Sequence, residues 1–235
     1  MRTFVINLAR RQDRRKRMES VLPAGLDVEF TTDWSGPVDG RELSLSSLAG
    51  YCLYPWRIES ANPWWSRSLK WGEIGCAVSH LLCWRRGLDE GLKRFLILED
   101  DVLFADDFIG RLEAGIEKIS GIDPAWGLIY AGRYPIDEDT PFLPGIVRPG
   151  YSHCTYGYVL SNHGAQSLAH AGLEKAIVPV DEFIPAMYCD HPRLDLRRAF
   201  PKRIRAYAFE PPLVTQLPKD VAGSDTEATE FVGSD

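Results

Sequence analysis

Short apolar runs alternate with amphipathic segments along this chain, and this alternation limits the fold more than any other feature. Strands are predicted from the apolar runs at residues 3–8, 28–32, 95–98, 128–131, 156–160 and near 204–209. Helices are predicted at residues 13–22, 73–88 and 108–119, and from a cap at Asn162 to residue 171. This order is typical of an α/β domain with a mainly parallel sheet and helices on both faces.

The other segments are predicted to be loops. Residues 35–67 are rich in Gly, Pro, Ser and Trp and show no period, and the chain after Pro179 is expected to be irregular. From Pro218 onward the chain is polar, which predicts a flexible tail or an active-site lid at 218–235. The length of 235 residues fits a single domain that covers the whole chain.

Composition excludes several classes of protein. The 27 basic and 33 acidic residues give a net charge of −6, which argues against a nucleic-acid partner. No run reaches the roughly 18 apolar residues of a transmembrane span, and no signal peptide is recognised, so a cytoplasmic location is expected, with peripheral membrane contact left open. The five cysteines, Cys76 among them, lack CxxC spacing and predict neither a zinc site nor a disulfide frame.

An acidic triplet, Glu99-Asp100-Asp101, directly follows the apolar run 95–98. Because side chains alternate along a strand, Glu99 and Asp101 are expected to share one face while Asp100 points away. A hard divalent cation would relieve the repulsion between the two carboxylates and could bridge to a diphosphate. The alternative interpretation is a solvated turn that caps the next helix.

A second acidic pair, Asp181-Glu182, stands between Pro179 and Pro185. Apolar and rigid neighbours favour a carboxylate held in place, and either residue could take the proton of an acceptor hydroxyl as a general base. The alternative is an N-cap on a short helix.

The basic run at residues 10–17 is interpreted mostly as the solvated face of a helix. Arg10 and Arg14 are four residues apart and close behind the first strand, where they could reach a phosphate. Ser79 and His80 lie on the helix that follows Gly72, and a helix start is a natural anion site. They are therefore candidate nucleotide contacts, although a lone His at this position is more often a satisfied core group, or a group that supports a ligand, than a ligand itself.

Nine segments, in this order and spacing, resemble glycosyltransferase family 25. They are INLARRQDRRKRM (6–18), VDG (38–40), GEIGCAVSH (72–80), LILEDDV (96–102), LIYAGR (128–133), YGYVLS (156–161), PVDEFIPAMYCDHP (179–192), AFEPPLVTQ (208–216) and GSDTE (223–227). The family includes bacterial lipooligosaccharide galactosyltransferases and the catalytic domain of procollagen galactosyltransferases. The PVDEF and SDTE segments are closer to the collagen-modifying branch.

The resemblance implies a GT-A type nucleotide-sugar-binding fold, a UDP-galactose or UDP-glucose donor, and Mn²⁺ (or Mg²⁺). It implies an inverting transfer of a hexose to a hydroxyl acceptor on a glycan or a protein, in lipopolysaccharide biosynthesis or in a reaction like collagen glycosylation. The alternative is a non-catalytic sugar-nucleotide or glycan-binding protein on the same fold.

The resemblance also assigns roles to residues. The metal ligands would be Asp101 with Glu99 or Asp100 assisting, and Asp225 as a late metal or phosphate contact. The nucleotide and donor-sugar contacts would be Asn7, Leu8, Arg10, Thr155, Tyr156, Gly157 and Asp181.

Overall fold

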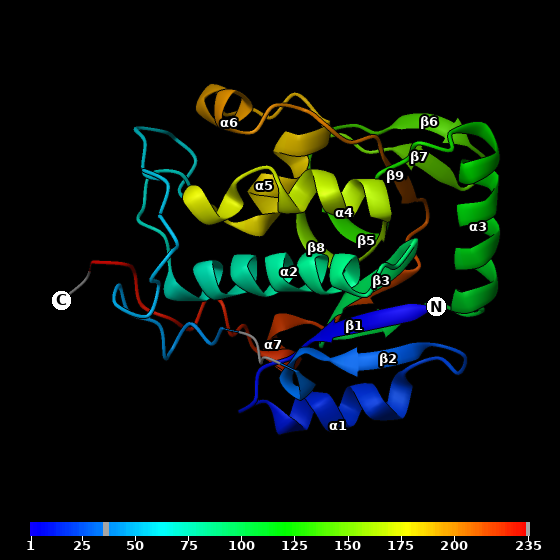
Figure 1. The fold of residues 1–235 in the computed structure, drawn as a ribbon, viewed down its shortest axis with the longest axis horizontal. Coiled ribbons are helices and arrows are strands. Elements are labelled where there is room, and N and C mark those ends of the chain that lie inside the picture. Colours follow the sequence, from blue (N-terminus) through cyan, green and yellow to red (C-terminus); the bar gives the residue numbers. More distant parts are fainter. Residues whose placement is uncertain (35–37, 234–235) are drawn as a thin grey trace.

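The computed structural model describes residues 1–34 and 38–233, whose strands form one sheet of eight and a second sheet of two. The order in the large sheet is β2-β1-β3-β8-β5-β9-β7-β6 (Figure 1). Its strands are β1 (Arg2–Ile6), β2 (Asp27–Phe30), β3 (Arg94–Glu99), β5 (Leu128–Pro135), β6 (Thr140–Leu143), β7 (Ile146–Arg148), β8 (Ser152–Ser161) and β9 (Ala206–Phe209). The small sheet pairs β4 (Val102–Phe104) with β10 (Val214–Gln216).

Most strands of the large sheet point the same way. β1 is parallel to β2 and β3, and β5 is parallel to β9. β8 runs antiparallel to its neighbours β3 and β5, and β7 runs antiparallel to β6 and β9. Only β8 and β7, among the strands described, therefore oppose the common direction, and the predicted mainly parallel sheet is confirmed.

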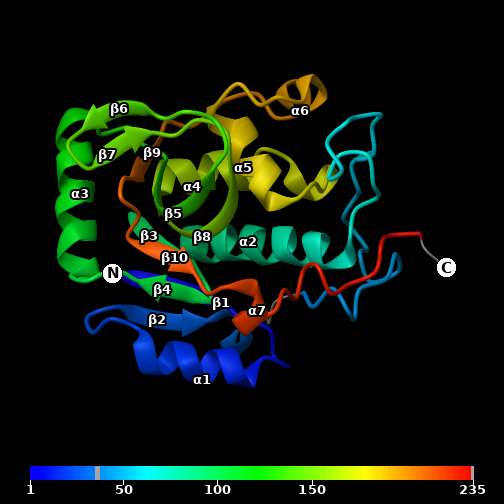
Figure 2. The ribbon, with the colours of Figure 1, turned by 180° about the vertical axis from the view of Figure 1, so that it is seen from behind.

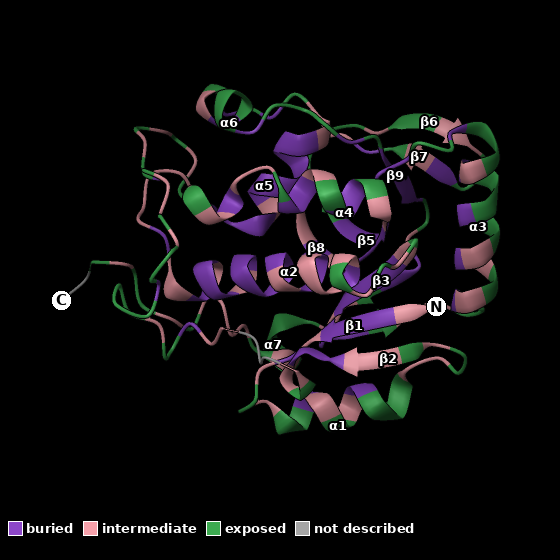
Figure 3. Ribbon diagram, viewed as in Figure 1, coloured by how far each residue is buried: buried purple, intermediate pink, exposed green. Residues whose placement is uncertain are grey.

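Helices cover both faces of this sheet, as the alternating sequence predicted. One face packs against α2 (Trp71–Asp89), α4 (Asn162–Ala169) and α5 (Val180–Tyr188), and the other against α1 (Gln12–Val21) and α3 (Phe108–Ile122). Two short helices, α6 (Leu194–Ala199) and α7 (Lys219–Ala222), follow, and 3₁₀ turns occur at Thr31–Asp33 and Leu173–Lys175. Figure 3 shows α2 mostly in the buried colour.

The apolar run that forms β3 explains this two-sided core. Phe95 and Ile97 belong to the cluster under α2 and α5, while Leu96 and Leu98 belong to the cluster under α3. All four are fully buried. Burial of one such side chain contributes roughly 1.5–3 kcal/mol, so a strand with two covered faces needs a continuous apolar run.

Two local predictions were wrong. The cap of α4 is Ser161, whose Oγ accepts a hydrogen bond from the Gly164 N–H, whereas the Asn162 amide donates to the Leu92 carbonyl, and the helix ends at Ala169. The chain after Pro179 is not irregular, because α5 begins at Val180. The prolines around it hid an apolar face that tertiary packing buries.

The expected loop at 35–67 is confirmed over residues 38–67, which form turns and one isolated bridge from Leu53 to Ile177, while 35–37 lie outside the described residues. The chain from Pro218 to residue 233 returns along the start of α2. Trp71 N–H donates to the Glu230 carbonyl, and Val232 N–H donates to Leu69 (Figure 2).

The segment predicted to be a flexible tail or a lid therefore lies, over residues 218–233, beside the loop of residues 38–67. Within the described part of the chain, no helix combines the length and the apolar character that a bilayer crossing requires.

Candidate active site

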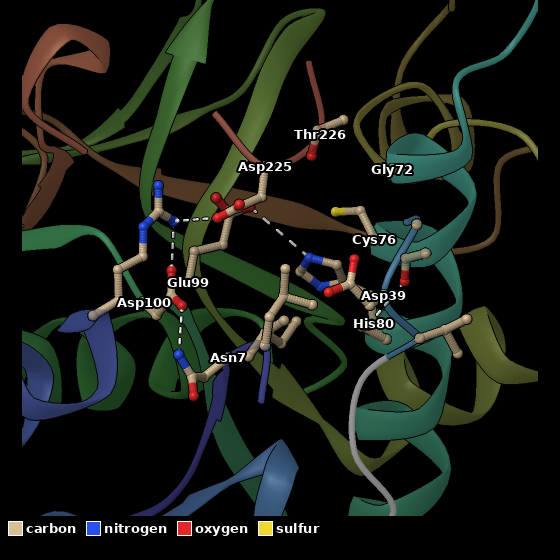
Figure 4. Close-up of a pocket in the computed structure, with 16 residues that line it drawn as sticks. Asn7, Asp39, Gly72, Cys76, His80, Glu99, Asp100, Asp225 and Thr226 are labelled. Atoms are coloured by element: carbon tan, nitrogen blue, oxygen red, sulfur yellow. Dashed lines mark hydrogen bonds and ion pairs between the residues drawn. The ribbon is translucent and has the colours of Figure 1, made fainter. Parts of the chain in front are cut away.

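Two cavities meet at the carboxyl ends of β1 and β3, beside the first turns of α2. The smaller, of about 90 Å³, contains most of the residues predicted to contact a nucleotide. These are Asn7, Leu8, Arg14, Ser79, His80 and Asp100, and the predicted metal ligands Glu99 and Asp225 line the same cavity (Figure 4). The larger, of about 450 Å³, contains Glu99, Thr155, Tyr156, Asp181 and Glu182. Cys76, Glu99 and Thr226 line both cavities, so the two are neighbours.

Three predicted site residues line neither cavity, namely Arg10, Asp101 and Gly157. Gly157 lies in β8, where an added Cβ would stand 2.7 Å from Leu98 Cδ2, so its role here is close strand packing. Ser79 also has a structural role, because its hydroxyl donates to the Gly75 carbonyl inside α2.

Glycines let two loops close over the start of α2. A Cβ at Gly72 would lie 2.6 Å from Thr226 Cα, and a Cβ at Gly40 would lie 2.5 Å from Gly72 N. A Cβ at Gly75 would overlap the Val38 carbonyl oxygen. The VDG, GEIG and SDT segments are therefore far apart in sequence but form one tightly packed seam, which is the wall of the smaller cavity.

Arg14 is the centre of the acidic cluster. Its Nη1 lies 2.7 Å from Asp100, 3.2 Å from Asp101 and 3.7 Å from Asp225. Its Nη2 donates to the carbonyls of residues 222 and 223 in the tail, each at 3.0 Å. The expected strand alternation fails here because β3 ends at Glu99 and the chain turns, so both aspartates reach the same guanidinium.

Asp225 is held by a cluster of arginines. Besides Arg14, it lies 2.7 Å from Arg10 Nη2 and 2.6 Å from Arg11 Nη1. Arg10 also donates to Asp39 at 2.7 Å. The tail carboxylate is thus neutralised by basic side chains from the end of β1 and the start of α1.

Glu99 has a different environment from the two aspartates that follow it. It accepts a hydrogen bond from Thr155 at 2.7 Å and lies 3.9 Å from His80 Nε2, and it forms no ion pair with a described arginine or lysine. Burial and the neighbouring Asp101 raise the pKa of Glu99 to about 8. Burial also lowers the pKa of His80 to about 3, so this imidazole is neutral.

The predicted manganese ligands do not fit this arrangement as a set. Glu99, Asp101 and Asp225 come within one region, but Asp101 and Asp225 both face Arg14. An oxygen-coordinated dication at these three groups would have to displace that guanidinium. Of the three, Glu99 alone faces the cavities without an arginine.

Asp181 and Glu182 are adjacent in the sequence, but their carboxylates have different surroundings. Glu182 accepts hydrogen bonds from Trp65, Tyr151 and His191 at 2.7–2.9 Å. Burial, the largest single effect, raises its pKa, but His191, Trp65 and His153 together outweigh burial and the net shift is downward. Asp181 makes no hydrogen bond or ion pair with any described side chain, and burial together with Glu182 raises its pKa to about 6. Asp181 is the open carboxylate of the larger cavity.

Sequence reasoning missed several residues of the larger cavity, among them Trp56, Trp64, Tyr134, His153 and Lys219. The high Trp content of residues 35–67 was the available signal, because aromatic rings are common walls of sugar sites. It could not show which rings face the cavity, since that loop has no period. Trp64 is 41% exposed, and Arg67 stacks on its ring at 4.8 Å.

Acidic, basic and aromatic side chains thus gather at the strand ends of an α/β sheet. Comparison with known proteins gives the class of this molecule as glycosyltransferases. The family description that matches residues 1–135 is glycosyltransferase family 25 (LPS biosynthesis protein). The chain belongs to glycosyltransferase family 25.

Relatives in animals match almost the whole chain. Procollagen galactosyltransferase 1 of Danio rerio is 36% identical over an alignment that covers 96% of this chain and 38% of that protein. Procollagen galactosyltransferase 2 of Mus musculus is 36% identical over 96% of this chain and 37% of its own length. The inactive glycosyltransferase 25 family member 3 of Homo sapiens is 37% identical over 96% and 39%. The chain thus spans about two fifths of the length of these relatives.

Proposed function

We propose that this chain is an inverting glycosyltransferase that moves galactose or glucose from a UDP-sugar to a hydroxyl group of a glycan or protein. The observation that carries the proposal is Asp181, a carboxylate without a described partner that faces a cavity of about 450 Å³. Its pKa of about 6 lies where a base is ionised at neutral pH and still accepts a proton.

The smaller cavity supports the nucleotide part of the proposal. Asn7 Oδ1 is buried there and has no hydrogen-bond partner among the described residues. A nucleotide N–H or O–H group would satisfy this acceptor, which otherwise carries a desolvation cost. A volume of about 90 Å³ is far below the roughly 300 Å³ of a typical ligand site, so the tail wall has to move outward to admit a nucleotide.

The proposed reaction uses the chain's own side chains. The acceptor oxygen forms a bond to C1 of the hexose while the bond from C1 to the diphosphate oxygen breaks, and UDP leaves with that electron pair. Asp181 takes the acceptor proton. Arg10, Arg11 and Arg14 face the negative charge that develops on the diphosphate once Asp225 has moved away. The manganese (or magnesium) requirement stays a prediction.

A non-catalytic binding role is the second candidate, and one observation favours it. A relative as similar to this chain as the galactosyltransferases are, the Homo sapiens protein at 37% identity, is named inactive. In this role the two cavities would hold a sugar nucleotide or a glycan without turnover, and Asp181 would be dispensable.

Release of UDP from UDP-galactose and UDP-glucose tests the proposal, measured with manganese and with a chelator present. Asp181→Asn should lower turnover by about 10²–10⁴-fold, because the general base is lost. Asp190→Asn is the matched control, since Asp190 is exposed and its carboxylate pairs with Lys202 alone among the described side chains. If the wild type binds UDP but releases none from the donors, the binding role is supported. If it shows no UDP binding and no UDP release, both candidate functions are wrong.

A further inference from the structure

Three side chains of different chemistry converge where the two cavities meet. A ligand atom each of Cys76, His80 and Glu99 lies within 4.8 Å of the other two. Cys76 and His80 stand four residues apart on one face of α2, and Glu99 ends β3. Figure 4 shows Cys76 and His80 projecting from the helix toward Glu99. Because helix and strand fix all three backbones, the convergence is built into the fold.

We propose that Cys76, His80 and Glu99 bind a borderline divalent cation such as Zn²⁺. Sulfur, nitrogen and oxygen donors together match the ligand preference of Zn²⁺ and Co²⁺ rather than that of the hard ions Mn²⁺ and Mg²⁺. Three protein ligands leave a fourth tetrahedral position, which here opens to the cavities.

The distances require only a small adjustment. Zinc bonds of the usual lengths place tetrahedral ligand atoms roughly 3.4–3.6 Å apart. His80 Nε2 and Glu99 Oε1 are already 3.9 Å apart. Rotation of the Glu99 side chain, which is 23% exposed whereas His80 is fully buried, can close the remaining gap.

Neighbouring side chains form hydrogen bonds to the proposed ligands and orient them, as the groups around the ligands of known metal sites do. The Tyr158 hydroxyl lies 2.7 Å from His80 Nδ1 and can accept its N–H, which directs the Nε2 lone pair toward Glu99. Thr155 donates to Glu99 at 2.7 Å. On binding, the Cys76 thiol and the protonated Glu99 carboxyl each give a proton to solvent, and the cation offsets the two negative charges that result.

The surrounding charges favour this position over the aspartates. Asp100, Asp101 and Asp225 all face Arg14, so a cation placed among them would be repelled. Glu99 lies beside the neutral His80 imidazole, the Cys76 thiol and the Thr155 hydroxyl, and no described arginine or lysine pairs with it. An ion at this point would stand between the two cavities, because Cys76 and Glu99 line both.

Co²⁺ is the probe, since thiolate coordination gives a ligand-to-metal charge-transfer band that carboxylates and imidazoles do not. The wild-type chain should show this band, and the near-isosteric Cys76→Ser should lose it. Cys154→Ser is the matched control, because Cys154 lines the larger cavity but is not one of the three ligands. It should keep the band.

Competition for Zn²⁺ with a chromophoric chelator gives the second readout. Cys76→Ser and Glu99→Gln should each weaken binding by about tenfold or more, the size of effect seen even for outer partners of metal ligands. Circular dichroism establishes that each variant is folded. A folded wild type without the band, or a band that survives in Cys76→Ser, overturns the proposal. Sugar donors are absent from both assays, so the outcome is independent of the proposed transferase activity.

Discussion

Asp181 and Glu182 are consecutive in the first turn of α5, yet their carboxylates have opposite surroundings. Glu182 accepts hydrogen bonds from Trp65, Tyr151 and His191, and its pKa is lowered. Asp181 faces the larger cavity without a described partner, and its pKa is raised to about 6. A helix directs neighbouring side chains about a quarter of a turn or more apart, so adjacent acids can have one structural and one chemical role.

The pH dependence of sugar transfer should report Asp181. A base works only when it is ionised, so the rate should rise as the pH increases through about 6 and then level off. The measurement is kcat/KM against pH for the wild type. A profile that is flat across this range would contradict the assignment of Asp181 as the base.

Glu99 should make stability depend on pH. Its folded-state pKa of about 8 lies above the ordinary value of 4.5, so between these values the folded state binds more protons than the unfolded state. Stability conferred by the protonated form is therefore lost as the pH rises through this window. Glu99→Gln lacks this loss and should exceed the wild type by more than about 1 kcal/mol at the upper end, since each pKa unit corresponds to about 1.4 kcal/mol.

Urea unfolding of wild type and Glu99→Gln at several pH values checks this prediction. The two stabilities should be close near the lower end of the window and diverge toward its upper end. Parallel curves would mean that Glu99 ionises normally in the folded protein.

Gly72→Ala should displace the tail. The new Cβ would meet Thr226 Cα at 2.6 Å and the Thr226 carbonyl oxygen at 2.7 Å, and neither backbone atom can yield without moving the segment. Hydrogen exchange at residues 224–231 should accelerate. Gly121→Ala is the matched control, because nothing lies within 4 Å of a Cβ there. Unchanged exchange in Gly72→Ala would show that the seam tolerates a side chain.

Arg14→Met should destabilise the fold by roughly 3–5 kcal/mol, because Asp100 and Asp101 would remain buried without their cation. Arg15→Met tests the same chemistry on the neighbouring residue, whose partners Glu19 and Asp33 are largely exposed. That change should cost no more than about 1 kcal/mol. Thermal unfolding of both variants gives the comparison, and equal losses would refute the central role of Arg14.

The fold could be predicted wherever a strand or helix is specified by its own residues. The run that forms β3 is apolar throughout because both faces are covered, and it was found within one residue at each end. The strands β4, β6, β7 and β10 have three or four residues each, and their pairing depends on tertiary contacts that no local pattern records.

The site was predictable in part for the same reason. Strand ends indicated Asn7 and Glu99, because a parallel sheet gathers such positions at one edge. The central place of Arg14 depends on the tail, which meets it only in three dimensions. Cys76 and His80 stand four residues apart in α2, a spacing that any helix provides, so the sequence alone did not single them out. Their proximity to Glu99 results from α2 packing beside β3.

The arginines around Asp225 also have a consequence for biosynthesis. Arg11 precedes Asp225 by 214 residues. At roughly 5–20 residues per second, a ribosome makes the basic cluster about 10–40 seconds before its acidic partner. Until residue 225 has been made, Arg10, Arg11 and Arg14 therefore lack this shared carboxylate, and the wall that Asp225 and Thr226 give the smaller cavity cannot form.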